Sequence, residues 1–163
     1  MTVAEIQGSP RAPRAGRVAV LVSRYNETVT TRLLEGARQC LHENGVPEAQ
    51  VDVIWVPGAF ELGVAAEAAA ASGRYAALVA LGCVIRGETV HFEYVAGEAA
   101  RGLGNVALAH RVPVGFGVLT TENLEQALTR AGGAGGNKGY EAAEAALSTA
   151  DVLAQLSRAA PRD

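Results

Sequence analysis

Cysteine, tryptophan and methionine are scarce in this chain of 163 residues, which holds two Cys, one Trp and one Met. Cys40 and Cys83 fall in an expected helix and an expected buried strand, without the paired spacing of a zinc site or a disulfide framework. Free cysteine commonly packs as a small hydrophobic side chain. We therefore expect two buried thiols that bind no metal and form no disulfide.

Clusters of Lys and Arg are also missing, and the formal net charge is -3. This charge pattern argues against a nucleic-acid-binding surface, although it is compatible with a local basic site. No apolar run approaches the roughly 20 residues needed to span a bilayer, and the first residues contain no apolar signal core. The sequence therefore favours a cytoplasmic protein that binds neither nucleic acid nor membrane.

Length and hydrophobic content set the number of domains. A chain of 163 residues with 49% hydrophobic residues can form one sizeable core but is too short for two ordinary domains. Residues 1–16 mix Pro, Gly, Ser and Arg without periodicity, which predicts an extended or mobile N-terminal arm. Within the arm, residues 3–8 are compatible with an edge strand that pairs with a neighbouring subunit. Residues 17–163 are expected to form a single domain.

Apolar runs alternate with helical patterns along the rest of the chain. The expected strands are 18–22, 51–56, 76–85 and 114–119, and the expected helices are 28–44, 60–72, 90–110, 122–130 and 139–157. Strands that are apolar throughout are typical of a parallel sheet covered on both faces. The sequence thus predicts the α/β class, as a three-layer α/β/α sandwich with a four-stranded parallel sheet in a flavodoxin-like arrangement.

Ligands of such sheets bind beyond the carboxyl ends of the strands, so the turns there are candidate sites. After the first strand, Tyr25 and Asn26 could stack on a planar ring and hydrogen-bond its edge, or pack and cap the next helix. After the second strand, Glu61 could accept hydrogen bonds from ligand hydroxyls or simply complement the helix dipole. For each of these two turns, a ligand-binding role and a structural role both stay open.

The turn after the third strand combines an expected helix start with a histidine. Gly87 and Thr89 suit an anion there, because the first N–H groups of a helix are unpaired and its dipole is positive. His91, in the first helical turn, is as compatible with general acid/base catalysis as with a structural role. His42 and His110 lie late in two helices and are expected to be structural or solvated.

A glycine-dense loop, residues 132–139, follows the fourth helix. It lacks the Walker spacing of a phosphate-binding loop, so a flexible connector is the simpler interpretation. Arg130 and Lys138 nevertheless place two cations beside it, which could hold an anion.

Four separated segments resemble the 6,7-dimethyl-8-ribityllumazine synthase family: residues 24–26, 56–61, 81–92 and 117–123. Residues 130–132 and 136–139 match too, and the resemblance extends from about Val18 to the final helix. It implies the condensation of 5-amino-6-(D-ribitylamino)uracil with 3,4-dihydroxy-2-butanone 4-phosphate, which releases phosphate and water in riboflavin biosynthesis. The family uses neither metal nor organic cofactor.

The resemblance also implies a role for each site residue. His91 would shuttle protons, and Tyr25 would stack on the pyrimidine where the family often has Phe or Trp. The pyrimidine and ribityl chain would contact Tyr25, Asn26, Ala59, Phe60, Glu61, Cys83, Val84 and Ile85, with Phe116 and Lys138 closing the site from an adjacent subunit. The phosphate would contact Gly87, Glu88, Thr89 and, from that neighbour, Arg130.

A homo-oligomer with shared sites follows from this resemblance, as a pentamer, a decamer or an icosahedral 60-mer, with riboflavin synthase as a further expected partner. Ala134 and Thr129 depart from the family, where Lys and an acidic residue are common. Three other functions stay open: an archaeal-type riboflavin synthase, a non-catalytic flavin or lumazine carrier, and a structural shell protein.

Overall fold

The computed structural model describes residues 2–158, and a parallel sheet with the order β2-β1-β3-β4 lies at its centre. The strands are β1 (Arg17–Ser23), β2 (Val51–Val56), β3 (Tyr75–Ile85) and β4 (Val114–Thr121). In this register Val20 lies between Val53 of β2 and Val79 of β3. The predicted four-stranded parallel sheet is confirmed.

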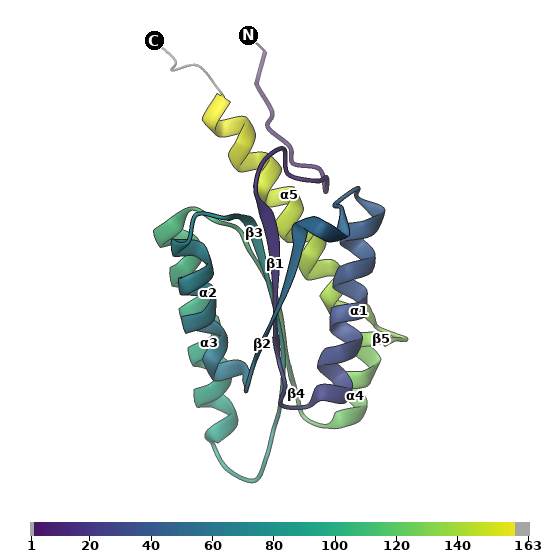
Figure 1. The fold of residues 1–163 in the computed structure, drawn as a ribbon. Helices are drawn as coiled ribbons and strands as arrows, with labels where there is room; N and C mark the ends of the chain where they lie inside the picture. Colours follow the sequence, from purple (N-terminus) through teal and green to yellow (C-terminus); the bar gives the residue numbers. More distant parts are fainter. Residues whose placement is uncertain (1, 159–163) are drawn as a thin grey trace.

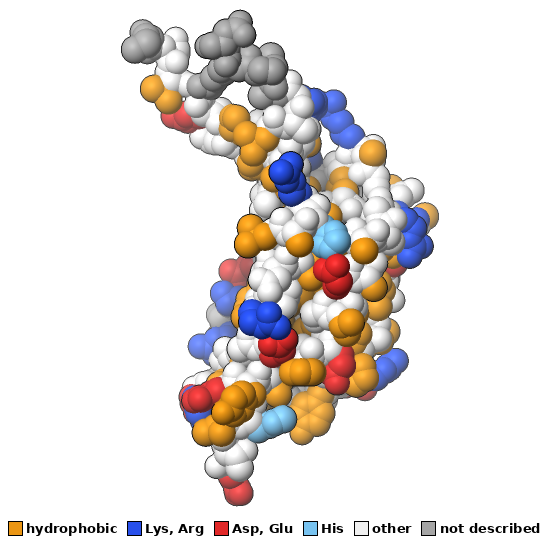
Figure 2. Space-filling model, turned by 90° about the vertical axis from the view of Figure 1, so that its left-hand side faces the viewer, with side chains coloured by type: hydrophobic (Ala, Val, Ile, Leu, Met, Phe, Trp, Pro, Cys, Tyr) orange, Lys and Arg blue, Asp and Glu red, His pale blue; other side chains and the backbone are white. Residues whose placement is uncertain are grey.

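Helices cover both faces of the sheet (Figure 1). One face carries α1 (Glu27–Glu43), α4 (Leu124–Arg130) and α5 (Lys138–Arg158), and the other carries α2 (Leu62–Ala71) and α3 (His91–His110). Figure 2 turns the second of these faces toward the reader and shows hydrophobic side chains scattered over it. The predicted three-layer sandwich is therefore confirmed.

Alternate residues of β1 feed two separate cores. Val18, Val20 and Val22 pack with α1 and α5, whereas Ala19 and Leu21 pack with α2 and α3. All five side chains are buried, as expected for a strand with a helical layer on each side. The two cores fix the sheet rigidly, so the turns at its carboxyl edge have defined positions.

Several element boundaries differ from the prediction. A 3-10 turn (Ala59–Glu61) precedes α2, and another (Glu48–Gln50) precedes β2. Strand β4 continues through Thr120 and Thr121, which pair with Val84 and Ile85 although they are polar. The glycine-dense loop contains a small antiparallel hairpin, β5 (Ala131–Gly133) and β6 (Gly136–Asn137). This hairpin was not predicted from the sequence.

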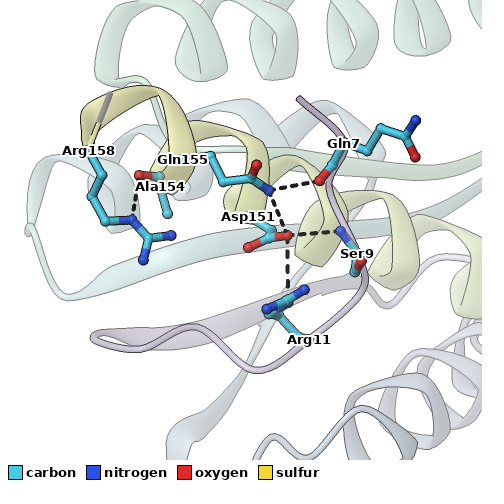
Figure 3. Close-up of polar contacts among 7 residues, drawn as sticks. All are labelled: Gln7, Ser9, Arg11, Asp151, Ala154, Gln155 and Arg158. Carbon is cyan, nitrogen blue, oxygen red and sulfur yellow. Dashed lines mark hydrogen bonds and ion pairs between the residues drawn. The ribbon is translucent and has the colours of Figure 1, made fainter. Parts of the chain in front are cut away.

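The N-terminal arm lies against α5 (Figure 3). The Ser9 N–H donates to Asp151 Oδ2 at 3.0 Å, and Gln155 Nε2 donates to the Gln7 carbonyl at 2.7 Å. Arg11 pairs with the same carboxylate at 3.6 Å. The Ser9 hydrogen bond in particular lowers the pKa of buried Asp151. Residues 2–16 form no strand within this chain, so pairing of 3–8 with a neighbour stays a prediction.

Candidate active site

A cavity of about 750 Å³ opens at the carboxyl ends of β1, β2 and β3, beside the first turns of α3. Its walls are Tyr25, Pro57, Gly58, Ala59, Phe60, Glu61, Cys83, Val84, Ile85, Gly87, Thr89, His91, Phe92 and Val95. In Figure 1 the strand ends and the start of α3 lie at the lower end of the molecule, opposite the labelled N-terminus. This is the edge at which open parallel sheets bind ligands.

The β1–α1 turn is tied to both neighbouring strands. Arg24 N donates to the Val56 carbonyl at 2.8 Å, and Tyr25 N donates to the Pro57 carbonyl at 3.0 Å. Asn26 adopts a left-handed conformation with φ 61°, and its Nδ2 donates to the Cys83 carbonyl at 2.9 Å. The Asn26 side chain makes no helix-capping hydrogen bond, and the Tyr25 side chain is 74% exposed at the cavity mouth. Asn26 thus occupies the N-cap position of α1 without a side-chain cap, and the Tyr25 ring is not packed within the chain.

The 3-10 turn after β2 presents an aromatic ring and a carboxylate to the cavity. Glu61 N donates to the Gly58 carbonyl at 3.2 Å, which closes the turn. Phe60 is 58% exposed, whereas Ala59 is buried. A side chain in place of Gly58 would come within 3.2 Å of Glu61 Oε2, so the carboxylate lies directly over that glycine. Phe60 and Glu61 can thus contact a ring and its hydroxyl-bearing substituent.

The third wall runs from the end of β3 to the start of α3. Cys83 is buried, and burial raises the pKa of its thiol to about 11, so the thiol is protonated at neutral pH. Thr89 Oγ1 accepts a hydrogen bond from His91 N at 3.4 Å. Helix α3 begins at His91, where its first N–H groups and the dipole favour an anion. An exposed imidazole therefore lies at a helix start that could hold an anion.

The cavity unites most of the expected site residues, but five of them lie outside its walls. Asn26 ties the β1–α1 turn to the Cys83 carbonyl, and Glu88 lies in the β3–α3 connection. Phe116 and Lys138 instead line a hollow of about 510 Å³ on the β4 and α5 side of the molecule. Arg130, at the end of α4, donates to the Gln126 carbonyl at 3.0 Å. The last three are the residues expected to serve a neighbouring subunit.

Four wall residues were missing from the expected set: Pro57, Gly58, Phe92 and Val95. Pro57 and Gly58 belong to a recognised turn. Phe92 and Val95 are three residues apart on α3, followed four residues later by buried Ala99, which is helical spacing toward one face. That periodicity could have revealed both.

Both cysteines are free and buried, as predicted. Within residues 2–158, no three His, Cys, Asp or Glu side chains gather in a way that could hold a metal ion. In the same residues, no helix combines the length and apolar character needed to cross a membrane.

Comparison with known proteins assigns the family. Residues 15–154 match the family described as 6,7-dimethyl-8-ribityllumazine synthase. The chain is 56% identical over 149 residues to a 6,7-dimethyl-8-ribityllumazine synthase of Edwardsiella ictaluri (strain 93-146), an alignment that covers 91% of this chain and 95% of the relative. The chain therefore belongs to the 6,7-dimethyl-8-ribityllumazine synthase family.

Proposed function

We propose that the cavity walled by Tyr25, Phe60 and His91 is where this enzyme carries out the reaction of its family. That reaction condenses 5-amino-6-(D-ribitylamino)uracil with 3,4-dihydroxy-2-butanone 4-phosphate to give 6,7-dimethyl-8-ribityllumazine, phosphate and water. One observation carries the proposal: turns from three different strands, each with a side chain suited to one part of these substrates, line the same cavity.

The pyrimidine fits between exposed aromatic side chains. Tyr25 and Phe60 are both largely exposed at this cavity, and aromatic faces stack on planar heterocycles. Ala59, Val84 and Ile85 supply apolar contacts around the ring. Asn26 acts by holding the turn, and Cys83 acts through its backbone rather than its thiol. The ribityl hydroxyls then donate hydrogen bonds to Glu61.

The phosphate of the second substrate binds at the start of α3. Backbone N–H groups of Gly87, Glu88 and Thr89 and the positive helix end supply the contacts for this dianion. The ketone then lies near His91, which transfers protons during carbinolamine formation, dehydration, loss of phosphate and ring closure. Orientation of the two substrates can supply about 7–11 kcal/mol, so most of the catalysis comes from placement.

A neighbouring copy completes the site. Phe116 and Lys138 lie on a different side of the subunit from the cavity, and the outer edge of β4 is unpaired within the described chain. When two different patches of one chain meet, a head-to-tail contact forms that closes into a ring if the rotation permits. We therefore assign Phe116, Lys138 and Arg130 to the site of the adjacent subunit, with Arg130 on the phosphate.

The wider organisation is proposed from the sequence and the family. The family resemblance favours a pentamer-based assembly, as a pentamer, a decamer or a 60-mer. Residues 1–16 are the arm and 17–163 the single catalytic domain. The enzyme works in the cytoplasm, and riboflavin synthase is its expected partner because that enzyme uses the lumazine product.

The test is a direct assay. Purified protein, mixed with both substrates, should form fluorescent lumazine and release one phosphate per lumazine, and omission of either substrate should abolish both signals. Riboflavin formation from lumazine alone would instead identify a riboflavin synthase, and tight flavin binding without turnover would identify a carrier. Light scattering of the same sample gives the assembly size, and assembly without any activity would identify a shell protein.

A further inference from the structure

Arg86 follows β3 directly and contacts two other parts of the fold. Its backbone N–H donates to the Thr121 carbonyl at 2.8 Å. Its side-chain Nε lies 3.1 Å and 3.0 Å from the two carboxylate oxygens of Glu122. Arg86 therefore holds the end of β3 against the end of β4 through both its backbone and its side chain.

The same guanidinium also contacts the first turn of α3. Its central carbon lies 4.6 Å from the centre of the Phe92 ring, within the range of a cation–π interaction. Its Nη1 lies 3.9 Å from Glu93 Oε1. Phe92 lines the cavity and adjoins His91, whereas Arg86 itself is not among the cavity walls. The guanidinium thus supports the cavity wall from outside.

We propose that Arg86 is a positioning residue, which fixes the first turn of α3, and with it His91, against the end of β4. The proposal rests on the function assigned above to His91 and the α3 start. Phe92 and Glu93 on one side and Glu122 on the other contact this one side chain, so Arg86 links the start of α3 to the end of β4. Arg86 has its charge matched by carboxylates and does not bind the substrate phosphate.

A pair of variants separates positioning from direct binding. Arg86→Met removes the link at both of its ends, and Glu122→Gln removes the carboxylate charge at its β4 end. The double variant therefore loses no contact beyond those lost in Arg86→Met. We expect kcat/KM to fall about tenfold in all three variants alike, because a displacement of about 1 Å at reacting groups can cost up to about 10²-fold and paired residues give non-additive effects. Arg101→Met is the matched control, since Arg101 pairs with Glu98 on the same helix, away from the cavity, at 2.6 Å.

Direct phosphate binding by Arg86 makes the opposite prediction. Glu122→Gln would then free the guanidinium, so that KM for the phosphorylated ketone would stay unchanged or fall while Arg86→Met raised it. That result, additive effects of the two changes, or an Arg86→Met enzyme with unchanged kcat/KM would each overturn the proposal.

A second measurement does not depend on turnover. Hydrogen–deuterium exchange of amides 87–95 should be faster in Arg86→Met and Glu122→Gln than in the parent protein and in Arg101→Met. Unchanged exchange in both variants would overturn the proposal even if activity fell. A parent protein without lumazine synthesis, combined with faster exchange in the two variants, would refute the assigned function but leave the positioning role of Arg86 standing.

Discussion

The side-chain amide of Asn26 donates a hydrogen bond of 2.9 Å to the backbone carbonyl of Cys83. This contact joins the β1–α1 turn to the end of β3, across 57 residues of sequence. The backbone of Asn26 is left-handed, with φ 61°, a conformation that asparagine tolerates better than most residues. Tyr25, the preceding residue, is thereby held at the cavity mouth.

Two replacements of Asn26 should distinguish the contribution of its hydrogen bond to stability from that of its left-handed backbone. Asn26→Gly removes the amide but suits the left-handed backbone, so we expect a loss of about 1 kcal/mol in the free energy of unfolding. Asn26→Ala should lose about 1 kcal/mol more, because its Cβ disfavours that conformation. Urea unfolding measures both. Equal stability of the Ala variant and the parent would refute the assigned role.

Loss of the imidazole at residue 91 should slow the reaction without abolishing it. His91→Ala removes proton transfer, typically worth about 10²–10⁴-fold in rate, but leaves the orientation of both substrates intact. Single-turnover lumazine formation should therefore remain above the spontaneous rate. The control is His110→Gln, since His110 contacts Glu67 at 2.8 Å at the far end of the same helix and should not affect kcat. Activity as low as that of heat-denatured protein would contradict the role of orientation.

Acid should destabilise the fold through Asp52. Arg17 donates two hydrogen bonds of 2.8 Å to this carboxylate and Tyr75 donates a third, which lowers its pKa from 3.8 to about 2. A depressed pKa stabilises the folded state above pH 3.8, and this contribution is lost as the pH falls toward 2. Because the Asp52 side chain is 34% exposed, we expect about 1 kcal/mol.

The comparison that checks this is unfolding free energy against pH for the parent and for Asp52→Asn. The parent should be more stable near pH 6, and the two curves should converge between pH 4 and pH 2. A constant difference across that range would show that the carboxylate charge contributes nothing.

Close contact between α1 and α5 depends on Gly139. A Cβ at this position would overlap the carbonyl oxygen of Leu33, which is backbone and cannot move aside. Gly139→Ala should therefore destabilise the fold by about 1–3 kcal/mol. Gly97→Ala is the control, because a Cβ there meets nothing within 4 Å and should be neutral or stabilising by up to about 1 kcal/mol. Thermal unfolding of the parent and both variants measures the difference. Equal melting temperatures for Gly139→Ala and the parent would contradict the close approach of the two helices.

The sequence predicts the sheet well because its signals are local. Apolar runs bounded by turn residues mark all four strands, and their alternation with helices indicates a parallel sheet. Strand β4 was underestimated because Thr120 and Thr121 are polar, although they pair with Val84 and Ile85. The β5–β6 hairpin was missed because a run of glycines carries no period, and its positive φ angles at Gly132 and Gly136 appear only in three dimensions.

The sequence predicts the part of the site that lies at the carboxyl edge of the sheet within one subunit. Tyr25, Glu61 and Thr89 each follow a different strand, and parallel strands bring their carboxyl ends together. The docking of the arm on Asp151 could not be predicted, since Ser9 and Asp151 are 142 residues apart and carry no shared pattern. Phe116 and Arg130 could be grouped with the cavity only through the family resemblance, because within one chain they lie outside its walls.

Mixing of two impaired variants tests most directly whether the active site spans two subunits. His91→Ala keeps Arg130, and Arg130→Ala keeps His91, so random mixed rings restore both residues at about one in four sites. Equal amounts, unfolded and refolded together, should regain about a quarter of the parent activity, above the average of the two variants refolded alone. Activity equal to that average would show that His91 and Arg130 do not meet across a subunit boundary.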